Sequence, residues 1–166
     1  MRKQAFDGNQ FHDSFLLSID FTDWLNKITM LFWCPCAGEV WEDGRYLSLT
    51  LENILFFGFE ASLMGLSGSG AVMFNEVALE ETSEELDIWT DRFTELSKTG
   101  QLYPDLADMA KKTRAYHFTF DGYPFQGRAF LKKGFQIMCQ DFHLSDVSHS
   151  LPSDMPKYHA NIIESQ

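Results

Sequence analysis

The chain has 166 residues, which suits a single domain large enough to remove roughly 70% of its unfolded surface from water. An apolar fraction of 45% with 16 phenylalanines predicts a globular protein with an aromatic core and argues against a disordered chain. The net charge of −11 argues against a nucleic-acid backbone or an anionic membrane as the partner, and it suits a basic partner.

The absence of targeting signals and the cysteine pattern predict a cytoplasmic protein. The sequence has no run of about 18 apolar residues that would form a membrane-spanning helix. Residues 1–10 begin with basic side chains but lack the apolar segment of a secretory signal. Three cysteines are an odd number, and Cys34 and Cys36 lie too close for an easy disulfide, so we expect a reducing compartment.

Alternating apolar residues predict strands in the first third of the chain. Residues 14–21 and 27–34 each show period-two alternation, and a turn at 22–26 would pair them as a hairpin. A further half-buried strand is predicted over residues 46–51. The apolar run 53–59 either extends that strand through a bulge at its first residue or forms a separate short strand.

The middle of the chain changes from strand to helix periodicity. A glycine-rich loop at residues 65–70 precedes a predicted strand at 72–80. Apolar residues then recur at intervals of three and four, which predicts a helix over 83–98 with a capping box formed by Thr82 and Glu85. The alternative is a strand, which the aromatic and β-branched residues at 88–94 would also suit. Proline at position 104 favours a short second helix to about residue 112.

The last third of the chain contains the best candidate for the centre of a sheet. Strands are predicted over residues 115–121 and 135–144, with a short strand between them at 128–131. In the final strand, Phe135, Ile137 and Cys139 would share one face, and Met138, Phe142 and Leu144 would share the other. Residues 145–166 are polar and are predicted to form a loose tail.

Strands at both ends of the chain with helices between them predict an α+β fold. We expect a mainly antiparallel β-sheet with one or two helices packed on one face. No linker separates domains, so residues 1–166 are predicted to form one domain with its core at about 12–144.

Candidate chemical groups are few, and no catalytic or cofactor motif stands out, so we expect no cofactor. Cys34 and Cys36 flank a proline and offer two thiolates to a metal. A four-ligand site would also need Cys139 and one of His12, His117, His143, His149 and His159, none of which sits at a recognisable ligand spacing. Asp141 and His143 lie two apart on a strand and would share a face, which is the minimum for acid–base work. His12 and Asp13 are adjacent and would point to opposite sides of an extended segment.

The most informative feature is an acidic segment over residues 76–95. It carries eight acids against one base, Arg92, and so accounts for −7 of the net charge. A merely solvated helix would interleave lysines, whereas one sign of charge creates a field that attracts a basic partner. The residues predicted to bind that partner are Glu80, Glu81, Glu84, Glu85, Asp87, Trp89, Asp91 and Glu95. The alternative is a soluble acidic face.

The motif His12-Asp13-Ser14-x-Leu16-x-Ser18-Ile19, followed by a second strand and by a Phe-x-Ile strand after Lys-Lys-Gly, resembles small uncharacterised bacterial domains. Some of those domains are predicted immunity proteins of polymorphic or contact-dependent toxin systems. The resemblance covers mainly residues 12–34 and 115–144. It implies binding without catalysis, and no family active residues transfer to this chain.

These observations favour a non-catalytic cytoplasmic protein, an immunity protein that neutralises a basic toxin through its acidic surface. Two alternatives remain open. One is a small enzyme or metal-binding domain that uses Asp141, His143 and the cysteines, and the other is a structural domain.

Overall fold

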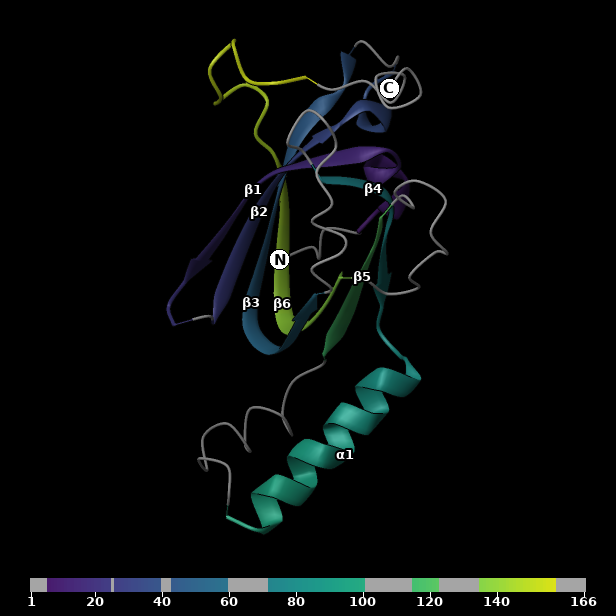
Figure 1. Cartoon of the computed structure of the whole chain (residues 1–166), viewed down its shortest axis with the longest axis vertical. Coiled ribbons are helices and arrows are strands. Elements are labelled where there is room, and N and C mark those ends of the chain that lie inside the picture. Colours follow the sequence, from purple (N-terminus) through teal and green to yellow (C-terminus); the bar gives the residue numbers. More distant parts are fainter. Residues whose placement is uncertain are drawn as a thin grey trace.

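The computed structural model describes residues 6–24, 26–39, 43–59, 72–100, 115–122 and 135–157. Within these residues, six antiparallel strands form a closed barrel in the order β1-β2-β3-β6-β5-β4 (Figure 1). The strands are β1 (Ser14–Thr22), β2 (Lys27–Cys34), β3 (Arg45–Phe59), β4 (Val72–Glu80), β5 (Tyr116–Gly122) and β6 (Phe135–Asp146). The helices are α1 (Glu84–Lys98) and two short 3-10 helices, η1 (Gly8–Phe11) and η2 (Pro35–Ala37).

The predicted antiparallel β structure with a helix is confirmed, but the sheet is a closed barrel and not an open sheet. Closure comes from β1 and β4, which pair at Ser14–Phe74, Phe15–Met73 and Leu16–Val72. The predicted helix on one face is also not what the structure has. Instead, α1 continues from β4 and extends beyond one end of the barrel (Figure 1).

Most predicted elements lie where the alternation places them. β1 and β2 form the predicted hairpin. Of the two readings of residues 53–59, extension of the strand is confirmed, because β3 is one strand. Its register shift lies between Ile54 and Phe56 and not at the predicted Asn53, which has φ 54°. The predicted loop at 65–70, helix at 104–112 and strand at 128–131 lie outside the described residues. No helix among the described residues has the length and apolar character to cross a membrane.

The barrel interior is the predicted aromatic core. Phe11 reaches it from η1, and its ring meets that of Phe32 edge-on at 5.1 Å between centroids. The Phe32 ring stacks on Phe120 with an interplanar angle of 3°. Because three separate elements contribute these rings, the aromatic contacts hold η1 and both sides of the barrel together.

The inward-facing side of β6 changes along the strand, which corrects the predicted faces. Ile137 and Cys139 belong to the core, and so does Leu144, although it has the opposite alternation. Asp141 and His143 are exposed. The change falls between Cys139 and Asp141, which pair with Ile54 and Glu52 of β3 on either side of Asn53, a residue with φ 54°.

The predicted loose tail is wrong for the described residues 145–157. Ser145 and Asp146 continue β6, and the following segment packs outside the barrel against Trp33 and Tyr46. The Tyr46 hydroxyl donates a hydrogen bond to the carbonyl oxygen of Met155 at 2.8 Å. The polar composition of this segment gave no sign of the packing, because only a few of its side chains contact Trp33 and Tyr46.

Candidate functional site

The helix α1 begins at a serine cap next to the barrel. The Ser83 hydroxyl accepts a hydrogen bond from the backbone N–H of Leu86 at 3.1 Å. The capping-box spacing predicted Thr82 as the cap residue. The structure instead places the cap at Ser83, one residue later. The end of β4 thus leads directly into the first turn of α1.

A buried histidine joins this cap to the barrel. His117 of β5 is fully buried, with its Nδ1 atom 3.1 Å from the Ser83 hydroxyl oxygen and its Nε2 atom 2.9 Å from Oε1 of Gln136. Glu80 lies 3.7 Å from the same Nδ1 atom. Both ring nitrogens of His117 therefore have partners, and the side chain fixes where α1 leaves the barrel.

Replacing Ser83 with alanine is expected to lower the free energy of unfolding by about 1 kcal/mol, since it removes the helix cap. It also removes a partner of the buried His117. Chemical denaturation followed by circular dichroism measures the loss. Thr82→Ala is the matched control, with an expected change within about 0.5 kcal/mol. An equal loss in both variants would contradict the assignment of Ser83 as the cap.

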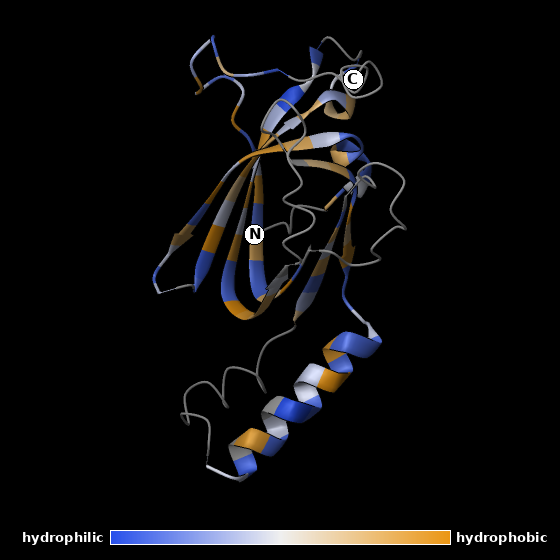
Figure 2. Cartoon of the chain, viewed as in Figure 1, coloured by the Kyte–Doolittle hydropathy of each residue, from blue (hydrophilic) through white to orange (hydrophobic). Residues whose placement is uncertain are grey.

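Four of the predicted partner-binding acids share one face of α1. Glu84, Asp87, Asp91 and Glu95 are spaced by three, four and four residues, so they lie one above another along the helix. All four side chains are exposed. We call them the acidic stripe. Figure 2 shows hydrophilic segments of α1 alternating with hydrophobic ones along the helix.

The other predicted acids flank the acidic stripe. Glu80 and Glu81 are exposed where β4 ends, and Glu85 is half-buried. The basic residues of α1 are Arg92 and Lys98, of which Lys98 lies in its last turn. The acids predicted to bind the partner thus all lie on α1 or at the end of β4 that leads into it.

On the opposite side of α1, near its start, an aromatic contact joins the helix to the barrel. Leu86 is buried, and the predicted binding residue Trp89 is half-buried, with its ring 4.7 Å from the ring of Phe56. Trp89 therefore anchors the helix more than it offers a free surface. Ile88, next to the acidic stripe, is 57% exposed.

A second surface feature, which the sequence reading missed, lies at the tip of the β1–β2 hairpin. We call it the aromatic hollow. Its volume is about 280 Å³, and Trp24 at its edge is fully exposed with φ 54°. It is lined by Phe21, Trp24, Asn26, Ile28, Ile54, Leu55, Phe56 and Phe57. Since Phe56 also contacts Trp89, the aromatic hollow adjoins α1.

The residues of the predicted acid–base or metal alternative are not brought together. Cys34 and Cys139 are buried in the core, whereas His143 and Asp141 are exposed. Burial, with the charge of Asp141, raises the pKa of Cys139 to about 12, so this thiol stays protonated. Among the described residues, these side chains do not offer ligand atoms to a common ion.

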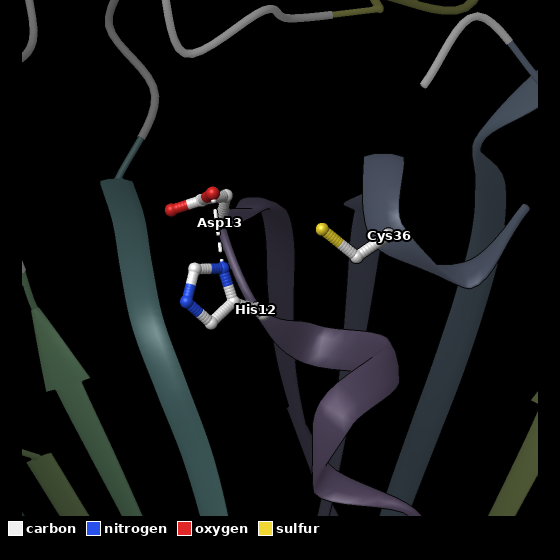
Figure 3. Close-up of side chains that lie close together, drawn as sticks. All are labelled: His12, Asp13 and Cys36. Carbon is white, nitrogen blue, oxygen red and sulfur yellow. Dashed lines mark ion pairs between the residues drawn. The ribbon is translucent and has the colours of Figure 1, made fainter. Parts of the chain in front are cut away.

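A different cluster forms where η1 meets β1. The Nδ1 atom of His12 lies 3.0 Å from Oδ2 of Asp13, and the ligand atoms of these two residues and of Cys36 all lie within 4.8 Å of one another (Figure 3). The prediction that His12 and Asp13 point apart is wrong, because Asp13 has φ 56° and is not extended.

A pocket of about 820 Å³ lies beside this cluster, between η1 and β4. Its apolar lining includes Phe6, Tyr116 and Phe142, and its polar lining includes Asn75 and His12. The volume is in the range of small-molecule sites. His12 thus belongs both to the cluster and to the pocket lining.

Comparisons with known proteins do not identify a relative. No protein-family model, curated protein or solved structure matches the chain. The immunity function that the sequence resemblance implies stays a prediction.

Proposed function

We propose that this chain is a non-catalytic binding protein that docks a basic protein partner against the acidic stripe of α1. The observation that carries the proposal is the alignment of four exposed carboxylates, Glu84, Asp87, Asp91 and Glu95, on one face of a helix at the end of the barrel. In this proposal the protein is non-enzymatic and cytoplasmic.

Helix stability explains only part of this charge pattern. Glu84 and Asp87 lie in the first turn, where negative charge stabilises the helix dipole. Asp91 and Glu95 lie beyond the first turn, where that effect has faded. Like charges at intervals of four residues repel each other, so the stripe lowers helix stability at these positions. Recognition of a cationic surface accounts for the acids that the helix does not need.

The field of the acidic stripe is suited to steering a partner. Neighbouring carboxylates on a helix face lie roughly 5–6 Å apart, which is below the Debye length of about 8 Å at physiological salt. Their potentials therefore add at the surface where a partner approaches. Such fields raise association rates by about 10- to 1,000-fold, and salt weakens them.

The aromatic hollow offers apolar contact area, which the acidic stripe lacks. Exposed carboxylates determine association rate and specificity more than affinity, whereas aromatic anchors contribute most of the binding free energy. Trp24 is fully exposed and Phe21 is 42% exposed at the barrel end that α1 adjoins. The aromatic hollow lies on the barrel side of α1, so a partner attracted by the acidic stripe would extend past the helix to contact it.

The resemblance to predicted immunity proteins extends the proposal to toxin neutralisation, with a basic toxin such as a nuclease as the partner. The product of the gene beside the coding gene is the first partner to test. We expect a 1:1 complex whose affinity falls as salt rises from about 50 to 200 mM, and protection of cells that express the neighbouring protein. Binding that does not respond to salt, or a partner with an acidic surface, would overturn the proposal.

A further inference from the structure

Three donor types converge beside η1. His12 supplies a ring nitrogen, Asp13 a carboxylate oxygen and Cys36 a thiol sulfur, with all three atoms within 4.8 Å of one another. Figure 3 shows the Cys36 sulfur directed toward the paired Asp13 and His12 side chains. Nitrogen, oxygen and sulfur together are the ligand types that zinc accepts.

The backbone conformation at Asp13 helps to position the side chains of the cluster. Asp13 adopts φ 56°, a left-handed conformation that is uncommon for residues other than glycine, although aspartate tolerates it better than most. This conformation brings its carboxylate to the side where His12 lies. The Asp13 side chain is only 9% exposed, so the negative charge sits in a mostly buried position next to a thiol and an imidazole.

Cys36 is separated from the core by the turn that η2 makes. Cys34 ends β2 with its side chain in the core, and Pro35 begins the 3-10 helix that carries Cys36. Cys36 is partly exposed, unlike Cys34 and Cys139. Of the three cysteines, it is therefore the one within reach of both Asp13 and an ion from solvent.

The same geometry does not suit a cysteine nucleophile. A base that activates a thiol must face it, but the Nδ1 atom of His12 is paired with Asp13 and the other ring nitrogen faces away from Cys36 (Figure 3). Burial and then the charge of Asp13 raise the pKa of the Cys36 thiol, which keeps it protonated. A cation would reverse this effect, since a coordinating thiol loses its proton.

We propose that His12, Asp13 and Cys36 bind one zinc ion, with a fourth position open to water. Ligand atoms around a tetrahedral zinc ion lie roughly 3.3–3.8 Å from one another, as bonds of about 2.0–2.3 Å require. The ligand atoms of the cluster, which lie within 4.8 Å of one another, would adjust to these distances when the ion binds. Binding releases the Cys36 proton to solvent and replaces the ion pair between His12 and Asp13 with two metal bonds. The site is independent of the acidic stripe.

Metal titration of the full chain tests this site. We expect one zinc ion per chain by calorimetry and elemental analysis, with excess Mg²⁺ present to occupy weak carboxylate sites. Cobalt(II) in place of zinc is expected to show a thiolate-to-cobalt charge-transfer band in the near ultraviolet. Zinc is also expected to protect one thiol of the native protein from alkylation.

Single substitutions identify the ligands. Cys36→Ser is expected to abolish the charge-transfer band, and His12→Gln to weaken zinc binding by about 100-fold or more, since losing a group that only orients a ligand costs roughly 10–100-fold. His143→Gln is the matched control, because His143 is exposed on β6 and lies outside the cluster. Circular dichroism of each variant verifies folding. Absence of 1:1 binding by the unmodified protein, or equal affinity in all three variants, would overturn the proposal.

Discussion

Replacing Phe32 with alanine is expected to lower the free energy of unfolding by about 3–5 kcal/mol. Phe32 is fully buried in the barrel and meets three rings: Phe11 of η1 at 5.1 Å, Phe74 of β4 at 6.2 Å and Phe120 of β5 at 6.3 Å. Alanine would leave a cavity between elements that lie far apart in the sequence. Because the barrel depends on closure between its first and fourth strands, this packing cannot be recovered by a local shift.

Urea denaturation of the two proteins measures this loss. Phe21→Ala is the matched control, because Phe21 is 42% exposed and its ring meets only the Phe57 ring, at 5.3 Å, among the ring contacts described. We expect the control to lose about 1 kcal/mol, the scale of an aromatic pair with partial burial. Similar losses in the two variants would show that the barrel interior is not the main source of stability.

The strand positions were predictable from the sequence because period-two alternation records which residues face the core. The prediction placed β2 at 27–34 and β4 at 72–80, as the structure has them. Closure of the sheet was not predictable, because the pairing of Ser14 with Phe74 depends on the curvature of all the strands between them. Alternation is a local property, and it is the same for an open sheet and a barrel.

The cluster of His12, Asp13 and Cys36 was missed for a related reason. Its prediction required the backbone conformation of Asp13, which tertiary packing fixes at φ 56°. Aspartate tolerates this region better than most residues, but nothing in the neighbouring sequence demands it. The exposed Trp24 had a usable signal in the sequence, because a large aromatic residue inside a predicted turn is unusual.

Reversing the acidic stripe is expected to slow association with the basic partner by about 10- to 1,000-fold. The variant carries lysine at positions 84, 87, 91 and 95, and its net charge rises from −11 to −3. Each of these side chains is exposed in the free protein, so the lost attraction acts mainly before contact and lowers the association rate. Stopped-flow or surface-based kinetics at several salt concentrations measures the rate, and its salt dependence is expected to weaken or invert.

A matched variant distinguishes the effect of the acidic stripe on association from the effect of total net charge. Asp20, Glu39, Asp43 and Asp154 are exposed acids on other parts of the chain, and their reversal to lysine gives the same net charge. If the acidic stripe steers the partner, this control is expected to slow association much less than reversal of α1. Equal slowing in both variants would mean that total charge, and not the helix, attracts the partner.

A variant with neutral side chains distinguishes a loss of attraction to the partner from a loss of helix stability. Lysine in the first turn opposes the helix dipole by about 0.3–1 kcal/mol per residue, so the reversed helix is expected to be less stable at its start. Glutamine at 84 and 95 with asparagine at 87 and 91 removes the charge without adding a repulsive one. We expect an association rate between those of the unmodified and reversed proteins. Since the Ser83 cap and the His117 contacts remain in this variant, an unchanged rate would show that the carboxylates do not steer the partner.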